Sequence, residues 1–431
     1  MSLYLHRDLD VSTGLTRRRD FLRTVSAGAV AMGTLGFRDL MTIQAAQLRK
    51  QGMSLILLWM QGGPSQLETF DPKPGTETGG PTRAINTAVP GIRIAEGWTA
   101  TAKAMGEIAL IRSMTNKEGQ HQRATYQLHT GYLPTGTVKH PNLGCSIAKE
   151  IAPADTDLPA VVSVGTTEGA GFLGVDYEPF VVQDPGTMPR NVTPTVQTPR
   201  FSRRLELTGK LDAEFAATGA SDTVRDHQQL YGKTSRLVLS PEVRSFDISG
   251  EPQSVKSLYG DSQFGKGCLL ARRLVESGVT FVTFNCVPWD HHGTPPQLET
   301  EVGARMLIPP LDRALGALID DLQQRGLYEK TLVVIMGEFG RTPRMNANRG
   351  RDHWGQTFSV VMGNAKMRMG QVIGRSSPRG EYVVDRPISP QDVAATVYHH
   401  LGIDSRNVIF RDTLNRPVPL IESGQPIREL L

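Results

Sequence analysis

The chain has 431 residues, and its 47 basic and 43 acidic side chains leave a formal net charge of +4. This length is enough for one large core, so a single domain with insertions suffices. So small a net charge gives no indication of nucleic-acid binding. Three cysteines allow at most one bridge and exclude a disulfide framework, and we expect them to be free buried thiols.

The N-terminal segment has the pattern of an export signal. The pair Arg18 and Arg19 precedes an apolar stretch rich in Ala and Gly from Val25 to Phe37. This arrangement resembles a twin-arginine signal, which a receptor of the export machinery reads and which is not an anchor. The stretch is too short and too weakly apolar for a stable membrane span. We therefore predict a signal peptide and linker over residues 1–46 and a periplasmic or extracellular protein; an amphipathic N-terminal helix is the alternative.

The first third of the chain contains the first candidate site residues. Residues 54–60, SLILLWM, form an apolar run typical of a strand buried on both faces, and Gln61 and two glycines follow it. The next expected elements are a helix over 98–109, a strand over 108–112 and a helix from His121 to Leu128. His121 therefore stands at a helix N-terminus, which favours anions and lowers the pKa of a histidine. An ordinary surface histidine is the alternative.

The middle of the chain ends in a candidate metal pair. The expected elements are a strand over 158–163, an irregular loop over 165–198, helices over 202–237 and 264–277, and a strand over 279–284. Asp290 and His292 lie beyond the last of these strands and are two positions apart, so in an extended loop they point the same way. A carboxylate with an imidazole suits zinc, manganese or iron. Such a pair also occurs without any metal, but its place after a strand favours a site.

Residues 331–353 are the most informative stretch. They open with TLVVIM, a run typical of another strand buried on both faces, and Glu338 follows it almost at once. A loop with four arginines then leads to the pair Asp352 and His353. Because ligands of open α/β sheets bind beyond the carboxyl ends of the strands, Glu338 stands where a site is expected, and the loop can return His353 to it. A strand followed by a solvated basic loop is the alternative.

The C-terminal part contains elements that frame this stretch. The expected elements are a helix over 308–324 before it, and then a strand over 358–362, loop and edge-strand material over 363–387 and a helix over 388–402. Ser389 is predicted as the N-cap of the last helix, with Pro390 at its first position and Asp392 in its first turn. His399 and His400 in its last turn are expected to complement the helix dipole rather than to bind metal.

Several stretches resemble the alkaline phosphatase and sulfatase superfamily. These stretches are HQRATYQLHTGYLPTG (121–136), WDHHG (289–293), TLVVIMGEFG (331–340) and ISPQDVAATVYHHLGID (388–404). The chain resembles one branch of this superfamily more closely, the family called domain of unknown function 1501. The stretches that carry this resemblance are SLILLWMQGGPSQLETFDPKP (54–74), SPEVRSFDISGEP (240–252) and GEFGRTPRMNANRGRDHW (337–354). The resemblance implies an α/β fold over 47–431: an alkaline-phosphatase-like three-layer sandwich with a mostly parallel central sheet and a loop and helical insertion around 165–260.

The resemblance also implies an activity and its residues. It implies an exported, metal-dependent hydrolase of phosphate or sulfate esters, whose substrate is an anionic small molecule or a glycan and whose cofactor is divalent zinc, calcium or manganese. The candidate metal ligands are Asp290, His292, Glu338 and His353; the candidate catalytic residues are His121 and Arg123; the candidate substrate-binding residues are Gln61, Arg341, Arg344 and Arg351. The strand ends near Gln61, His121, Asp290 and Glu338 are expected to converge on one cleft.

The chain departs from the superfamily at four positions that matter for chemistry. Gln61 stands where a metal-binding Asp is expected, and the nucleophile position falls on His121 rather than on Ser, Thr or Cys. Phe339 replaces the His of an Asp-His pair, and Cys145 lacks the sulfatase modification pattern. A phospho- or sulfo-histidine intermediate is chemically possible. The alternative function is a non-catalytic protein that binds a sulfated or phosphorylated glycan on the same fold.

Overall fold

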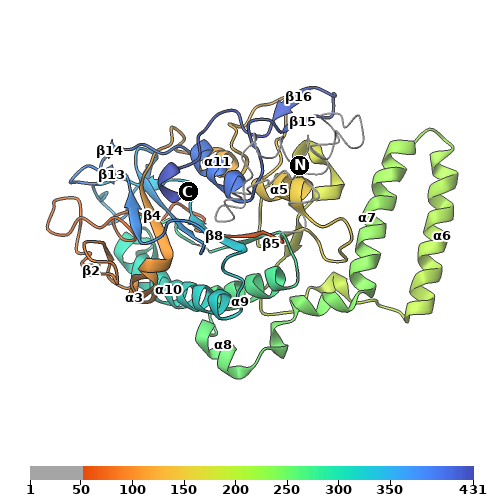
Figure 1. The fold of residues 1–431 in the computed structure, drawn as a ribbon, viewed down its shortest axis with the longest axis horizontal. Coiled ribbons are helices and arrows are strands. Elements are labelled where there is room, and N and C mark those ends of the chain that lie inside the picture. Colours follow the sequence, from red (N-terminus) through yellow and green to blue (C-terminus); the bar gives the residue numbers. More distant parts are fainter. Residues whose placement is uncertain (1–51, 287) are drawn as a thin grey trace, which may run out of the picture.

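A computed structural model describes residues 52–286 and 288–431, so the predicted export signal lies outside the described residues. A central sheet runs through the body, with helices packed on both of its faces (Figure 1). Among the described residues no helix is both long enough and apolar enough to cross a bilayer.

The central sheet has eight strands within the described part of the chain. In spatial order they are β12 (Gln371–Ile373), β4 (Ile108–Met114), β11 (Phe358–Gly363), β8 (Thr331–Met336), β1 (Ser54–Trp59), β7 (Phe281–Asn285), β5 (Val161–Val164) and β6 (Phe180–Val182). Only β11 runs antiparallel to its neighbours β4 and β8, and the other pairs are parallel. The C-terminal ends of seven strands therefore meet at one edge. This mostly parallel sheet confirms the predicted fold class.

Side chains of the central strand β1 alternate between two apolar layers. Ile56 and Leu58 belong to one buried cluster, and Leu55 and Leu57 belong to the other. The first cluster is covered by α3 (Thr99–Lys103), α9 (Gln263–Glu276) and α10 (Thr300–Gln324), and the second by α4 (His121–Thr130), α5 (Leu143–Ile151) and α11 (Pro390–His400). Burial on both faces explains why a parallel strand is a continuous apolar run rather than an alternating one.

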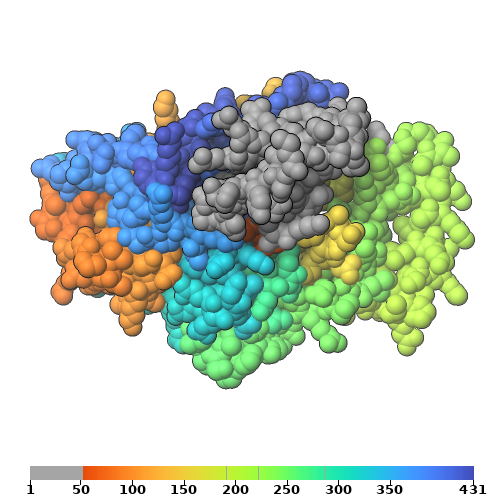
Figure 2. All heavy atoms as spheres, viewed as in Figure 1, coloured from red at the N-terminus to blue at the C-terminus, as the bar shows by residue number. Residues whose placement is uncertain are grey.

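The remaining elements are short or lie outside the sheet. They are α6 (Thr198–Ala216), α7 (Ser221–Leu239), α8 (Gln253–Tyr259), β2 (Ala84–Asn86), β3 (Arg93–Ala95), β9 (Gly340–Arg341), β10 (His353–Trp354), β13 (Arg375–Ser376), β14 (Val383–Asp385), β15 (Ile409–Arg411) and β16 (Pro417–Pro419), with 3₁₀ turns η1 (Ala104–Glu107), η2 (Gly171–Leu173), η3 (Val175–Tyr177), η4 (Arg190–Val192), η5 (Pro241–Phe246), η6 (Ile248–Gly250), η7 (Pro296–Leu298) and η8 (Arg428–Leu430). Helices α6 and α7 form a hairpin that projects from the body (Figure 1; light green in Figure 2).

The C-terminal helix α11 begins as predicted. The Ser389 side chain accepts a hydrogen bond from the Asp392 amide, and the Asp392 carboxylate accepts one from the Ser389 amide, so both caps of a capping box are present. His399 and His400 lie in its last turn, outside the group of side chains that could share a metal ion. The three cysteines are free and buried, as expected.

Three predicted elements differ from the structure. The helix expected over 308–324 begins at Thr300 and passes through Pro309 and Pro310. Its first turn is held from outside, because the Thr300 amide donates to the Arg349 carbonyl and the Thr300 hydroxyl to the His291 carbonyl. The stretch 202–237 is two helices rather than one. Strand β6 lies inside the loop expected over 165–198, since three residues are too few to give a period-2 pattern.

A buried histidine on α4 makes stability sensitive to acid. The His129 ring packs edge-on against Trp59 at 4.2 Å between centroids, and its Nδ1 atom is 2.9 Å from the Thr125 carbonyl oxygen. Burial lowers the pKa of His129 to about 4. In the unfolded chain the His129 ring takes up a proton at the ordinary histidine pKa, whereas in the folded protein it does so only near pH 4. The stability that the neutral buried ring contributes is therefore fully present above the ordinary pKa and is lost as the pH falls toward 4.

We expect His129→Phe to flatten this acid dependence. Between pH 6.5 and 4 the free energy of unfolding of the wild type should fall by about 3 kcal/mol more than that of the variant, from about 1.4 kcal/mol per pKa unit. Urea unfolding at pH 7, 5.5 and 4.5 measures the difference. His227→Phe, at a partly exposed histidine on α7, is the matched control. Equal slopes for wild type and His129→Phe would contradict the assignment.

Candidate metal centre

Four side chains converge beyond the C-terminal edge of the sheet. The ligand atoms of His121, Asp290, His292 and His353 all lie within 4.8 Å of one another. Asp290 Oδ1 is 2.9 Å from His292 Nε2, 3.3 Å from His121 Nε2 and 3.7 Å from His353 Nε2. His121 is the first residue of α4, the pair from 290 to 292 follows β7, and His353 lies in β10. Segments far apart in the sequence therefore build one cluster.

Each imidazole is oriented by a hydrogen bond at its other nitrogen. The Nδ1 atoms of His121, His292 and His353 lie 2.7 Å from Glu338 Oε1, 3.2 Å from Asp352 Oδ1 and 2.7 Å from the Gly119 carbonyl oxygen, respectively. A carbonyl or an ionised carboxylate can only accept, so each Nδ1 donates. All three Nε2 atoms then face the same point with their lone pairs. Metal-bound histidines are held by carboxylate or carbonyl acceptors in this same way.

The cluster needs a positive charge at its centre. The Nε2 atoms of His292 and His353 are only 3.0 Å apart, and two lone pairs at this distance repel each other unless a proton or a cation lies with them. The buried Nε2 atom of His121 has no partner with hydrogen-bond geometry. The neighbouring carboxylates of Asp290 and Glu338 raise the pKa of His121 to about 9. Burial would raise the pKa of Asp290, but the adjacent His121, His353 and Arg341 side chains hold it well below its usual range.

Arg341 is buried and completes the wall behind Asp290. Its N–H groups are directed at the carbonyl oxygens of Gly62, Gly63 and Arg351, at His292 Nε2 and at Asp290 Oδ1. The contact with Asp290 is 2.5 Å long and the contact with His292 is 3.1 Å long. Because a guanidinium has five N–H donors and all five are occupied, Arg341 has none left for a substrate. It contacts Asp290 directly, and the substrate-binding role predicted for it stays a prediction.

Glu338 stands behind His121 rather than among the ligand atoms. It follows β8 by two positions and is fully buried. One carboxylate oxygen accepts from His121 Nδ1 at 2.7 Å and from the Gly62 amide at 2.9 Å. Glu338, predicted as a metal ligand, therefore lies outside the group of side chains that could share an ion, whereas His121, predicted as catalytic, belongs to it.

The family described as "Protein of unknown function (DUF1501)" matches residues 53–431. The chain belongs to this family. The match covers nearly all described residues and confirms the family resemblance that the motifs indicate. No curated protein matches the sequence.

Solved structures with a similar fold are distant from this member of the DUF1501 family. The lipoteichoic acid synthase LtaP from Listeria monocytogenes is 13% identical, with 88% of this chain and 76% of that chain covered and a TM-score of 0.39. The PsFucS1 sulfatase from Pseudoalteromonas sp. is 15% identical over 84% and 72% of the two chains, with a TM-score of 0.38. A protein in the alkaline phosphatase superfamily from Vibrio parahaemolyticus is 11% identical over 86% and 76%, with a TM-score of 0.34. Likenesses this distant carry no argument about activity.

Two further arginines of this DUF1501 chain pair with carboxylates outside the cluster. Arg123 makes two hydrogen bonds of 2.8 Å with Glu118 on the solvent side of α4, and its catalytic role stays a prediction. Arg344 is exposed and lies 3.4 Å from Glu77. An exposed arginine pairs with the carboxylate that lies nearest in the folded protein, and the sequence pattern does not show which carboxylate that is.

The two remaining substrate candidates have opposite environments. Arg351 is fully buried and pairs with Glu68 at 2.7 Å, which indicates a structural role, and the substrate contact stays a prediction. Gln61 is exposed beside the cluster, where its side-chain oxygen accepts from Asn285 at 3.3 Å. The predicted convergence of strand ends near Gln61, His121, Asp290 and Glu338 is what the structure shows.

Sequence reasoning missed two supports of the DUF1501 cluster. Asp352 and the Gly119 carbonyl orient His292 and His353, and only Asp352 could have been suspected, since it precedes a candidate ligand. The expectation that side chains two positions apart share a direction correctly distinguished His291 from its neighbours Asp290 and His292. His291 points the other way, packs against Gly303 of α10 and is buried, and this burial lowers its pKa to about 4.

Proposed function

We propose that the chain is a metal-dependent hydrolase of phosphate or sulfate esters, with a divalent ion held by His121, Asp290, His292 and His353. The observation that carries the proposal is the convergence of three Nε2 atoms on one carboxylate oxygen, each imidazole being fixed by an acceptor at Nδ1. A divalent ion there supplies a Lewis acid for the ester oxygen and lowers the pKa of a water molecule.

The donor set favours one class of metal over another. Three imidazoles and one carboxylate suit zinc, manganese or iron. Calcium prefers six to eight oxygen ligands, so it fits this cluster poorly. Arg341 keeps Asp290 ionised and adds a fixed positive charge beside it. These features support a transition-metal or zinc site.

The first turn of α4 supports an anionic substrate. Gln120 is the N-cap residue, and its side chain makes no cap hydrogen bond. The first amide N–H groups of a helix have no partner within the helix, and together with the helix dipole they favour an anion. Because His121 opens this helix, an ester oxygen at the helix start would lie next to the cluster.

The geometry argues against a covalent intermediate on His121. Its Nδ1 atom is directed at Glu338 and its Nε2 atom at Asp290, so neither nitrogen is free to attack an ester. No Ser, Thr or Cys stands at the corresponding sequence position, and the three cysteines are buried elsewhere. The chain is therefore expected to use water as the nucleophile, with His121 in a ligand role.

The test is elemental analysis followed by an activity screen. Purified protein should contain one divalent ion per chain and should hydrolyse an aryl phosphate or an aryl sulfate, and a chelator should lower the rate by at least about a hundredfold. Readdition of the metal should restore it. Protein with full metal occupancy and no turnover on either ester class would contradict the hydrolase.

A second candidate function follows from the nucleophile position. It holds His121, whose two nitrogens lie against Glu338 and Asp290, and not Ser, Thr or Cys. This observation favours a metal-containing protein that binds a sulfated or phosphorylated glycan without cleaving it. Saturable binding of a sulfated glycan by the metal-loaded protein, without release of sulfate, would support this alternative.

We also propose export through the twin-arginine pathway, from the pair Arg18 and Arg19. Replacing both residues with lysine should abolish export, because the receptor reads the arginine pair. Fractionation of cells that produce the wild type or the double variant measures this. Unchanged export of the variant would contradict the proposal.

A further inference from the structure

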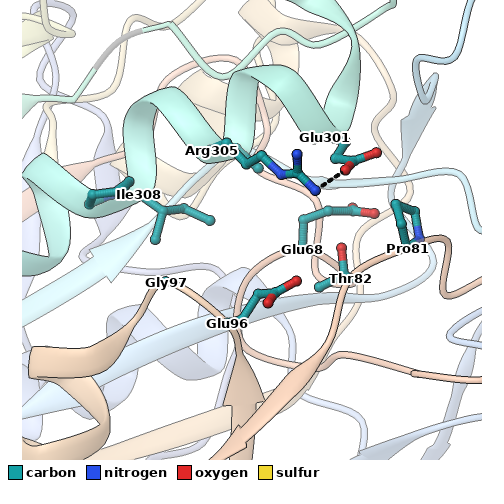
Figure 3. A pocket seen from close by; sticks show the side chains of 10 residues that line it. Glu68, Pro81, Thr82, Glu96, Gly97, Glu301, Arg305 and Ile308 are labelled. Carbon is teal, nitrogen blue, oxygen red and sulfur yellow. Dashed lines mark ion pairs between the residues drawn. The ribbon is translucent and has the colours of Figure 1, made fainter.

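A pocket separate from the metal centre lies between the start of α10 and the chain from Glu68 to Gly97. Its volume is about 340 Å³. Glu301, Ala304, Arg305, Ile308 and Pro309 of α10 form one wall, and Glu68, Pro81, Thr82, Glu96 and Gly97 form the other. Figure 3 shows the Glu68 carboxyl between the Arg305 and Glu301 side chains on one side and Thr82 and Glu96 on the other. We call this space the Glu68 pocket.

Glu68 has an unsatisfied carboxylate oxygen in this pocket. The side chain is 3% exposed, and Arg351 approaches only one of its oxygens, with Nη2 at 2.7 Å and Nε at 3.2 Å from Oε1. The other oxygen, Oε2, is buried and has no hydrogen-bond partner. A buried charged oxygen without a partner is costly, so it points to a donor that occupies the pocket.

The charges around the pocket leave an excess of one negative charge. Three carboxylates line it, those of Glu68, Glu96 and Glu301. Two guanidinium groups oppose them, since Arg351 pairs with Glu68 and Arg305 pairs with Glu301. Glu96 accepts only a backbone amide hydrogen bond, from Arg83 at 3.2 Å. A ligand with a single positive charge would balance the set.

A metal ion fits these carboxylates less well than an organic cation. Among the described residues, the group around His121 has ligand atoms close enough to share an ion, and the carboxylates of the Glu68 pocket do not form such a group. An ammonium group has three donors and needs no closed coordination shell. The pocket volume falls in the range of small-molecule sites, and Ile308, Ala304 and the prolines supply apolar walls.

We propose that the Glu68 pocket binds a small amine with one positive charge, whose ammonium group donates to Glu68 Oε2 and is balanced by Glu96. Thr82 offers a hydroxyl to a polar substituent on the same ligand. Arg351 separates this pocket from the metal centre, because its guanidinium pairs with Glu68 while its backbone carbonyl accepts from Arg341. The amine site is therefore distinct from the ester site and does not depend on it.

The test is a titration with amines and their neutral counterparts. Ethanolamine and glucosamine hydrochlorides are compared with ethylene glycol and glucose by calorimetry and thermal melting, in amine-free buffer at constant ionic strength. The amines should bind saturably and the neutral compounds should not. Chelator-treated protein should give the same result, so a failed metal proposal would not affect this one.

Variants locate the site. Glu96→Gln removes the excess charge at an exposed position and should weaken amine binding about tenfold or more, whereas Glu206→Gln on the distant helix α6 should not change it. Equal binding of glucose and glucosamine, or unchanged amine binding by Glu96→Gln, would overturn the proposal. Calcium binding that displaces the amine and is lost in Glu96→Gln would show a metal site instead and would also overturn it.

Discussion

His353→Ala should bind its divalent ion at least about a hundredfold more weakly than the wild type, since loss of a supporting residue alone costs 10–100-fold. The variant lacks one of three Nε2 donors that converge on Asp290 Oδ1. Its fold should persist, because the histidine is anchored by one hydrogen bond to the Gly119 carbonyl and by the short β9–β10 pairing, whose backbone bonds alanine can keep. Elemental analysis after dialysis and competition with a coloured chelator measure the affinity.

Two further variants test whether the loss of metal affinity depends on the distance of the substitution from the cluster. Asp352→Asn removes the negative charge that orients His292 and should weaken the metal about 10–100-fold. His227→Ala on α7, far from the cluster, should leave the metal content unchanged.

A chelator should also lower the melting temperature of the wild type more than that of His353→Ala, since a ligand at a hundredfold excess over its dissociation constant adds about 2.7 kcal/mol. Equal metal content in the wild type and His353→Ala would remove the site.

Arg351→Met should destabilise the fold by about 3–5 kcal/mol. The guanidinium is fully buried and pairs with Glu68, which is also buried. Removing it leaves the carboxylate without a counter-charge and also frees the carbonyl oxygens of Thr78 and Thr342. Denaturant unfolding at neutral pH measures the change.

Two comparisons separate this structural role from a substrate role. The double variant Glu68→Gln, Arg351→Met should recover part of the loss, because the uncompensated charge is gone. Arg123→Met at the exposed pair with Glu118 should leave the denaturant midpoint almost unchanged, because exposed ion pairs contribute little to stability. An Arg351→Met protein of normal stability with a raised KM for an anionic ester would restore the substrate role predicted from sequence.

The members of the His121, Asp290, His292 and His353 cluster were predictable where chemistry and local geometry coincide. Asp290 and His292 were found because side chains two positions apart share a direction in an extended loop and because the loop follows a buried strand. His353 was found because a loop leaving β8 can return to the same edge of the sheet. Glu338, predicted as a metal ligand, lies behind His121, and nothing in the sequence shows that it reaches His121 from 217 positions away.

The arginines were not predictable for a physical reason. Four arginines in a loop beside a candidate site indicate anion binding, yet whether each guanidinium is free depends on carboxylates and carbonyls distant in sequence. Arg351 meets Glu68 across 283 positions. The same holds for the helix start at Thr300, which is fixed by contacts with the site loops and not by a local cap. Local patterns therefore predict the strands and strong caps better than the partners of long polar side chains.

The position of the ligands along the chain has a consequence for folding. His121 and Glu338, which must meet to orient one ligand, are 217 residues apart, and β8 lies between β1 and β11 in the finished sheet. Bringing such distant segments together carries a large loop-closure entropy, and contacts of this kind form late. An ion at the proposed site would therefore not act as a nucleus. It would bind a chain whose sheet is already assembled, so metal uptake would be a kinetic marker for the last step of folding.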